Sequence, residues 1–200
     1  MPALRITKNE SLLCTIGSDD VWMYSVSVWF DLWGPAVSTL DISGGGKRRP
    51  DGGADILVWE IPQVLSVGDR LAFSFESATV SNPKGKVFKN DSPAATEEED
   101  LESEAVSEDE DLHELESRPI KNSGITWMCS LDGRAGIKVG PNPVRPHVGL
   151  LLLWNEDSPE RMRVSLSRSS LREIATRSGG ESTLLEYVPV GSRLDLVIGG

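Results

Sequence analysis

The sequence has few of the residues that usually build active sites, metal sites or disulfides. Its 200 residues include two cysteines and two histidines. Cys14 and Cys129 are too few for a disulfide framework and too far apart for a local metal pair, so we expect buried, unpaired thiols. His113 lies in an acidic run and His147 at the edge of a proline-rich segment, so neither has the neighbours of a catalytic triad or metal-ligand spacing. We therefore predict no enzyme activity, no metal and no cofactor.

Sequence motifs of catalysis and phosphate binding are missing as well. No G-x-S-x-G, H-E-x-x-H or C-x-x-C occurs. The segment GGGKRRPDGG, residues 44–53, has the glycines and lysine of a phosphate-binding loop, but such a loop continues from Lys to Ser or Thr and into a helix. Here Arg48 and Arg49 follow Lys47. We predict a flexible basic surface loop, and we take these three cations as candidates for contact with an anionic partner.

The chain also lacks a long hydrophobic run. Nothing approaches the ~18 apolar residues that cross a bilayer, and the first ten residues, MPALRITKNE, do not read as a secretory leader. The sequence therefore predicts a soluble, cytoplasmic protein without a membrane partner.

Basic residues are missing from one segment only. Residues 97–116 hold 12 of the 31 acidic residues and no Lys or Arg, which leaves 19 acids against 20 bases in the remaining chain. High charge with few large apolar residues predicts a disordered linker over 81–117. The run, including Glu108, Asp109, Glu110 and Asp111, is either a solvated tether, a docking segment for a basic partner or, through DLHELES, a short helix. Nucleic acid is not the expected partner, because the acidic run would repel it.

One phrase of the sequence occurs twice. VGDRLAFSFE, residues 67–76, returns as VGSRLDLVIG, residues 190–199, which places Gly68 and Arg70 on Gly191 and Arg193. Further matches place Lys8-Asn9 on Lys121-Asn122, Cys14 on Cys129, Asp31 on Asn155, Pro35 on Pro159, and Ser43 on Ser167. The pattern favours an internal duplication. The alternative is that two β-rich halves resemble each other because strands and turns use few residue types.

Strand signals dominate both halves. Segments rich in β-branched and aromatic residues, bounded by Gly, Pro or Asp, lie at 11–17, 21–32, 36–43, 54–61, 70–76, 125–131, 148–154, 161–167, 182–188 and 192–198. GLLLLW, residues 149–154, is apolar on both sides and indicates a strand covered on both faces. A helix is predicted after Ser170, with Glu173 completing a capping box and Gly179-Gly180 ending it.

The sequence therefore predicts an all-β protein of two similar sandwich-like or small-barrel units, residues 3–80 and 118–200, that pack together, with one short helix in the second unit.

Tryptophan and tyrosine gather in WMYSVSVWFDLW, residues 22–33. Along a strand, Trp22 and Tyr24 share one face while Met23 and Trp29 share the other. Burial in the core is the favoured interpretation. The alternative, stacking on a ligand, applies to those rings that stay exposed.

These features favour a protein-interaction module, for example a bacterial adaptor, inhibitor or immunity-type protein, over an enzyme. Besides the loop cations and the acidic run, the candidate partner-binding residues are Arg134, Lys138 and Arg145 in the loop 133–147. A carbohydrate- or small-molecule-binding β-module is the alternative. The duplication together with the terminal Gly199-Gly200 also resembles a tandem ubiquitin-like modifier, which is a minor alternative. The sequence leaves the oligomeric state open.

Overall fold

The computed structural model describes residues 2–17, 19, 21–30, 38–48, 54–59, 64–77, 81–87, 124–176, 178 and 180–200. The predictions for Trp33, Arg49, Gly179, the acidic residues 108–111 and linker residues 88–117 lie outside these residues. Residues 81–87 of the predicted linker are described and are ordered: Asn82 pairs with Thr15, and Lys86–Val87 forms strand β8 on β5 (Ala54–Val58).

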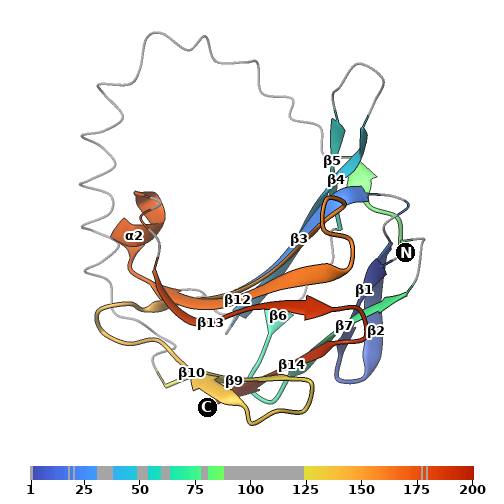
Figure 1. The fold of residues 1–200 in the computed structure, drawn as a ribbon. Helices are drawn as coiled ribbons and strands as arrows, with labels where there is room; N and C mark the ends of the chain where they lie inside the picture. The colour runs from blue at the N-terminus through green and yellow to red at the C-terminus, as the bar shows by residue number, and fades with distance from the viewer. Residues whose placement is uncertain are drawn as a thin grey trace, which may run out of the picture.

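The described chain is almost entirely β and forms two layers (Figure 1). Sheet A has the strand order β10-β9-β14-β7-β1-β2, and its strands are β1 (Pro2–Lys8), β2 (Ser11–Gly17), β7 (Arg70–Ser77), β9 (Thr126–Leu131), β10 (Ile137–Val139) and β14 (Arg193–Gly199). Sheet B has the order β13-β12-β11-β3-β4-β5-β8, with β6 on β4, and its strands are β3 (Val21–Phe30), β4 (Ser38–Arg48), β5 (Ala54–Val58), β6 (Val64–Leu65), β8 (Lys86–Val87), β11 (His147–Asn155), β12 (Arg161–Ser169) and β13 (Glu181–Pro189).

Strands from both sides of the linker are hydrogen-bonded into the same two sheets. At the centre of sheet A, β7 pairs with β14; at the centre of sheet B, β3 pairs with β11. In sheet A, β1 and β2 follow β7 on one side of the central pair, and β9 and β10 follow β14 on the other. In sheet B, β4 and β5 follow β3, and β12 and β13 follow β11. All pairs are antiparallel, as expected for an all-β chain. The boundaries predicted for the two units stay a prediction.

The two copies of the repeated phrase take equal positions in sheet A. Gly68 and Gly191 both have positive φ, 94° and 100°, where a side chain would be strained. Two residues later, the Arg70 N–H donates to Asn9 Oδ1 and the Arg193 N–H donates to the Asp132 carboxylate. Asn9 thus matches Asp132 in space.

This spatial match corrects two pairs of the sequence comparison. Lys121-Asn122 lie outside the described residues, and the residue that takes the place of Asn9 is Asp132. Cys14 lies on the edge strand β2, whereas Cys129 lies on β9, next to the central pair. The reason is that hydrogen-bond register, rather than residue identity, decides which positions are equivalent.

The core lies between the sheets and draws on both halves. Alternate residues of each strand point inward, and Leu71, Phe73, Leu150 and Leu152 are fully buried. Phe30 of sheet B stacks on Trp127 of sheet A with ring centroids 4.7 Å apart. An aromatic pair of this kind stabilises by about 1 kcal/mol beyond its buried area.

The aromatic strand β3 follows the predicted alternation with one exception. Tyr24 is buried and stacks on Trp154 at 5.3 Å, while Met23 and Trp29 lie on the outer face. Trp22 departs from the face of Tyr24, because the register shifts between Val21 and Met23. The shift places Trp22 with Met23 in a cavity on the outside of sheet B.

The glycine-rich segment is a strand as far as Arg48, so the prediction of a flexible loop is wrong for residues 44–48. Gly44 pairs with Tyr24 and Leu57, and Gly45 with Met23 and Ile56. Glycine by itself has a low preference for the strand conformation, and hydrogen bonds to the neighbouring strands hold this segment in it.

The predicted helix is present but short. Helix α2 (Leu171–Ala175) begins at the N-cap Ser170, and both hydrogen bonds of the capping box with Glu173 are made. It ends at Thr176, before the predicted glycines. Within the described ranges, no helix is long and apolar enough to span a membrane.

Candidate binding surfaces on the outer sheet faces

The outer face of sheet B carries large apolar side chains. Trp29, Ile56, Leu185 and Tyr187 are 40%, 56%, 51% and 63% exposed. The register places them on the side opposite the core together with Met23, Val58, Leu151 and Leu153. We call these eight residues the apolar face.

Two rows of residues cross this face from β13 to β4. Leu151 and Leu153 form the centre, and neighbouring strands place serines beside them. The rows are Leu185, Ser165, Leu151, Ser27 and Asp41, and then Tyr187, Arg163, Leu153, Ser25 and Ser43. The run GLLLLW was predicted to be covered on both sides. The core covers Leu150 and Leu152, whereas Leu151 and Leu153 are half-buried.

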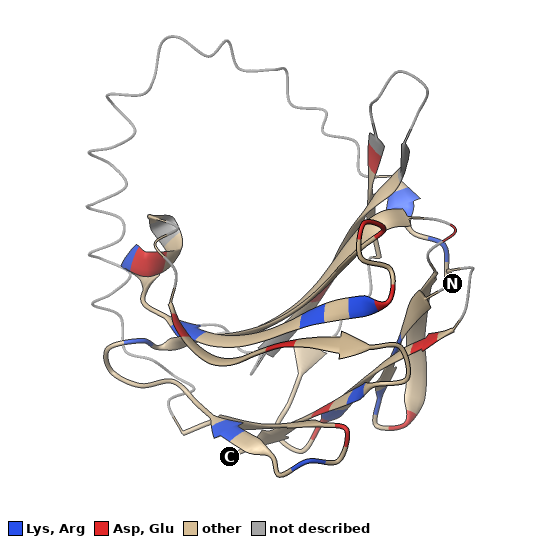
Figure 2. Cartoon of the chain, in the orientation of Figure 1, with Lys and Arg blue, Asp and Glu red and all other residues tan. Residues whose placement is uncertain are grey.

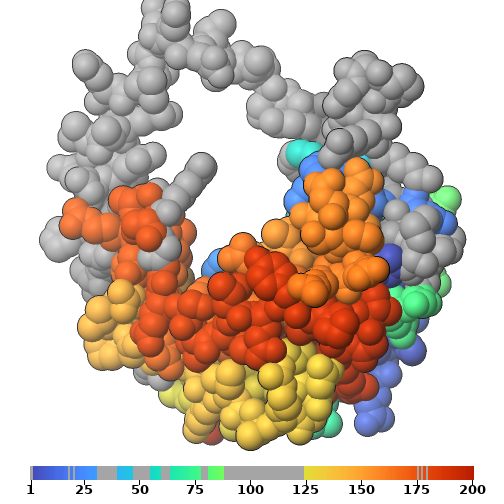
Figure 3. All heavy atoms as spheres, in the orientation of Figure 1, coloured from blue at the N-terminus to red at the C-terminus, as the bar shows by residue number. Residues whose placement is uncertain are grey.

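The face is concave. Sheet B bends away from sheet A at both ends of its strands (Figure 1), and the surface is hollowed between α2 and the turn that joins β11 to β12 (Figure 3). A further cavity of about 270 Å³ lies at the β3–β4–β5 end, lined by Trp22, Met23, Ser25, Ser43, Gly44, Gly45, Asp55 and Ile56.

Charges of opposite sign flank the apolar face. Arg161 and Arg163 lie on β12, where Figure 2 shows basic positions at its start. Asp41 lies on β4 opposite Ser27 and is exposed. Arg163 lies inside the face, between Leu153 and Tyr187, so the two sides of the central residues Leu151 and Leu153 differ in charge.

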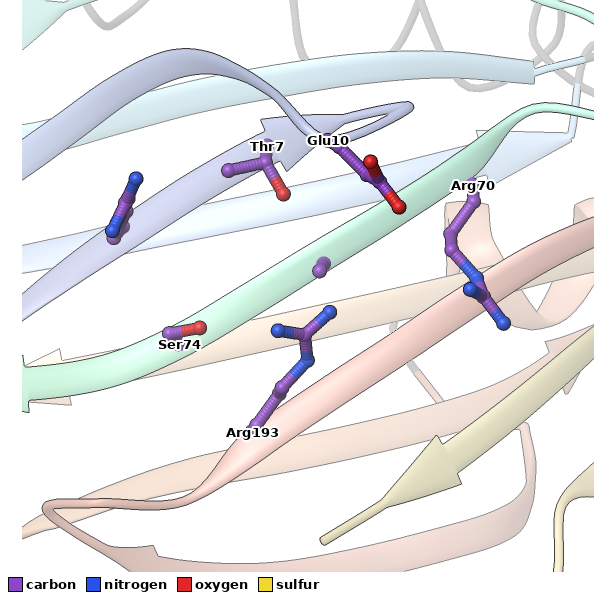
Figure 4. Close-up of a pocket in the computed structure, with 7 residues that line it drawn as sticks. Thr7, Glu10, Arg70, Ser74 and Arg193 are labelled. Carbon is purple, nitrogen blue, oxygen red and sulfur yellow. The ribbon is translucent and has the colours of Figure 1, made fainter. Parts of the chain in front are cut away.

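The outer face of sheet A holds a second hollow, which we call the arginine site (Figure 4). It measures about 310 Å³, and its lining consists of Arg5, Thr7, Glu10, Arg70, Ala72, Ser74 and Arg193. The floor is open because Ala72 and Ser74 have small side chains. Figure 4 shows Glu10 and Arg193 turned toward each other across β7, with Ser74 and Arg70 at either end.

Strand register brings these residues together. Arg5 and Arg193 both pair with Ser74, from the two sides of β7. Glu10 belongs to the β1–β2 turn, where its φ is 70°, and Asn9 beside it fixes that turn to Asp69 through a 2.8 Å hydrogen bond. Partial burial opposes ionisation of Asp69, but hydrogen bonds from Lys8, the Ser66 N–H and Asn9 lower its pKa.

Two of the arginines predicted from sequence lie in ion pairs within the chain. Arg134 donates to both oxygens of Glu186 at 3.1 and 2.6 Å, which joins the β9–β10 turn of sheet A to β13 of sheet B. Arg145 lies 2.8 Å from Glu173 and 3.7 Å from Glu181. The hydrogen bond from Arg145 lowers the pKa of Glu173 to about 2, and bonding to Ser170 adds to this.

The remaining predicted cations are dispersed. Lys138 is exposed on β10, and its register through Met128 and Val197 to Arg70 puts it on the outer face of sheet A. Lys47 and Arg48 end β4, and their side chains lie outside what the structure describes. A partner-binding role for the residues named from sequence stays a prediction.

The described cysteines are unpaired, and the described metal-binding side chains form no cluster. Cys14 and Cys129 are free and buried, and burial raises the pKa of Cys14 to about 12 and that of Cys129 to about 11. Burial lowers the pKa of His147. Among the residues described, no three His, Cys, Asp or Glu side chains group as metal ligands.

Comparison of the chain with protein-family models, with curated proteins and with solved structures gave no match. The geometry of the two outer faces therefore carries the functional argument. Sequence reasoning identified Arg70 and Arg193 as markers of the repeat but did not place them in a site. Alternation in RIT, RLAFS and RLD was the available signal, since it puts Arg5, Arg70 and Arg193 on the faces of their strands that point away from Leu and Phe.

Proposed function

We propose that the protein is a non-catalytic interaction module that binds an amphipathic helix of a partner protein on the apolar face. One observation carries the proposal: four large apolar side chains, 40–63% exposed, lie on a single concave sheet face. Scattered apolar residues are ordinary on a protein surface, whereas a contiguous patch marks an interaction site.

The shape and composition of the face suit a helix. A helix with its side chains is about 10 Å across, which fits a concave sheet better than a flat partner does. Leu151 and Leu153 would contact its apolar stripe, with Leu185 and Trp29 on either side. Burial of apolar surface contributes about 25 cal/mol per Å². A partner that covers these residues therefore gains more binding free energy from them than from contacts at the rim of the interface.

The flanking charges would fix the direction of the helix. Arg163 lies between Leu153 and Tyr187 on one side of the central leucines, and Asp41 lies beside Ser27 on the other. A bound helix with acidic residues on one flank and basic residues on the other matches both signs in one orientation and meets like charges in the reverse orientation. Such complementarity contributes mainly to specificity.

The fold also supports an inferred internal duplication. Apart from β6 and β8, each strand on one side of a central pair has a counterpart on the other side, and Gly68 and Gly191 both have positive φ. The apolar face crosses the junction of the halves, because Trp29 comes from the first and Leu185 from the second. We infer that the binding face arose at the contact between two copies.

Site-directed photocrosslinking tests the proposed function. A photoreactive phenylalanine analogue replaces Tyr187 in one variant and Met128, which is 42% exposed on the outer face of sheet A, in the control. The Tyr187 variant is expected to crosslink one discrete protein in extracts of the source cells, at a segment that mass spectrometry maps to an amphipathic helical sequence, and the Met128 variant is not. Equal yields from both positions would contradict the proposal, and a crosslink to a second copy of this chain would replace the partner with a homodimer.

A second candidate function is carbohydrate binding, which one observation favours. The ring of Trp29 lies against Gly149, where a Cβ would collide with it, and is 40% exposed. An exposed aromatic ring on the same strand face as Ser27 and Ser25 is a surface on which a sugar ring stacks. Titration with neutral oligosaccharides, followed by tryptophan fluorescence, should show saturation that Trp29→Ala removes. No response from the intact protein excludes this candidate.

The tandem-modifier alternative is not proposed. Gly199 is part of β14 and pairs with Thr126, and α2 has five residues, whereas a β-grasp unit needs a longer helix.

A further inference from the structure

We propose that the arginine site, on the face opposite the apolar face, binds a phosphate monoester group. This site is independent of the proposed helix-binding function, because it lies on the other sheet and uses other residues.

The arginines of the site differ in their pairing. The Arg193 guanidinium is held by Asp195, with Nε–Oδ2 and Nη2–Oδ1 distances of 3.1 and 2.9 Å. The side chains of Arg5 and Arg70 have no hydrogen bond or ion pair with any residue that the structure describes. Two uncompensated positive charges therefore line the cavity beside a third that is already paired, with Glu10 as the one carboxylate in the lining.

Comparison of the two central strands shows why Arg70 is uncompensated. Arg70 and Arg193 begin β7 and β14 in equal positions, and the residue two places later is Ala72 in one strand and Asp195 in the other. These two residues also pair directly with each other at the centre of sheet A. In β14 the carboxylate neutralises its arginine. In β7 a methyl group that is only 4% exposed stands in its place, so Arg70 has no carboxylate at this position.

Other residues of the arginine site also differ between the two halves, and again the positive charge is in the first half. Arg5 pairs with Ser74, whereas the corresponding positions in the second half are Met128 and Val197, which also pair. The first half thus has an arginine beside a serine where the second half has a methionine beside a valine. The two halves share a backbone plan, and the hollow lies over Arg5, Arg70 and Ser74 of the first half, with Arg193 of the second half at its edge.

The chemistry of the lining fits a phosphate monoester. Arginine guanidinium groups bind phosphate oxygens through paired N–H donors, and the hydroxyls of Thr7 and Ser74 supply neutral donors. A phosphate monoester carries about −1.5 to −2 at pH 7, which the charges of Arg5 and Arg70 can neutralise, while Glu10 across β7 opposes binding. The hollow of about 310 Å³ holds the phosphate and the few atoms that carry it. The source is either a small phosphorylated molecule or a phosphorylated side chain.

Calorimetric titration with free phosphoserine, at low ionic strength, tests the proposal. Saturable binding is expected, and Ala72→Asp should weaken it about tenfold by pairing with Arg70. Ala72→Asn has the same shape without the charge, so its affinity should stay well above that of Ala72→Asp. Asp195→Ala frees Arg193 and should strengthen binding. Lys138→Gln, on the same face but outside the cavity lining, should leave it unchanged.

Several outcomes would overturn the proposal. These are no saturation by phosphoserine, equal affinities of Ala72→Asp and Ala72→Asn, or a loss in Lys138→Gln as large as in Ala72→Asp, which would indicate a general charge effect. Circular dichroism of each variant verifies the fold. A phosphoserine peptide that binds more than tenfold tighter than free phosphoserine would identify a protein source, and equal affinities would identify a small molecule.

Discussion

At the scale of single residues, Gly44 shows how a glycine is required by its neighbours. It lies on the inner side of β4, where a Cβ would be 2.8 Å from the Met23 carbonyl oxygen and 3.3 Å from the Trp59 ring. A run of glycines reads as a loop because it has no side-chain pattern. In this strand the Trp59 ring fills the space beside Gly44 that a side chain would otherwise occupy.

Gly44→Ala should therefore destabilise the protein by about 1–3 kcal/mol, because the added methyl group meets a backbone carbonyl that cannot move easily. Urea unfolding followed by circular dichroism measures the change. Gly124→Ala is the matched control, since a Cβ there meets open space, and its effect should stay within about 0.5 kcal/mol. Equal effects of the two substitutions would contradict the packing described for β4.

The two thiols give a second prediction at this scale. Burial raises the pKa of Cys14 to about 12 and that of Cys129 to about 11, so both stay protonated at pH 8 and are shielded from reagent. Ellman's reagent should react with neither thiol in the folded protein and with both in 8 M urea. Rapid reaction of the native protein would show that these strands are not in the core.

At the scale of elements, α2 is held in place by an ion pair with a residue outside the helix. Its capping box follows from the sequence, whereas the ion pair between Glu173 and Arg145 does not, because Arg145 comes from the loop before β11. Glu173 therefore both caps the helix and anchors that loop.

The lowered pKa of Glu173 predicts a pH dependence. Its carboxylate has a folded-state pKa of about 2 against an ordinary 4.5, so its stabilising effect is complete above pH 4.5 and is lost as the pH falls toward 2. The urea midpoint of the native protein should exceed that of Glu173→Gln at pH 6, and the difference should disappear near pH 2. A difference that does not change with pH would mean that the charge of Glu173 is not involved.

The elements also show how far the sequence predicts the fold. Alternation and β-branched residues located most strands, including β3 and β12, and the capping residues located α2. Strands β1, β6, β8 and β10 and the partners of each strand were not predicted, because pairing depends on contacts between distant segments. The arginine site was missed for the same reason, since its three arginines come from three strands that only the register brings together.

At the scale of the whole molecule, the two halves share their sheets. The central pairs, β7 with β14 and β3 with β11, each join strands from opposite sides of the linker. Separate halves would expose a central strand of each sheet, with its unpaired backbone groups. Both binding faces depend on this arrangement, because the arginine site and the apolar face each take residues from both halves.

Cleavage between the halves tests this claim most directly. A protease site inserted between residues 100 and 110 allows the purified chain to be cut once after it has folded. The account predicts that the cut protein elutes from gel filtration as a single species of the intact size and unfolds in one transition. Two smaller species, each folded alone, would contradict it.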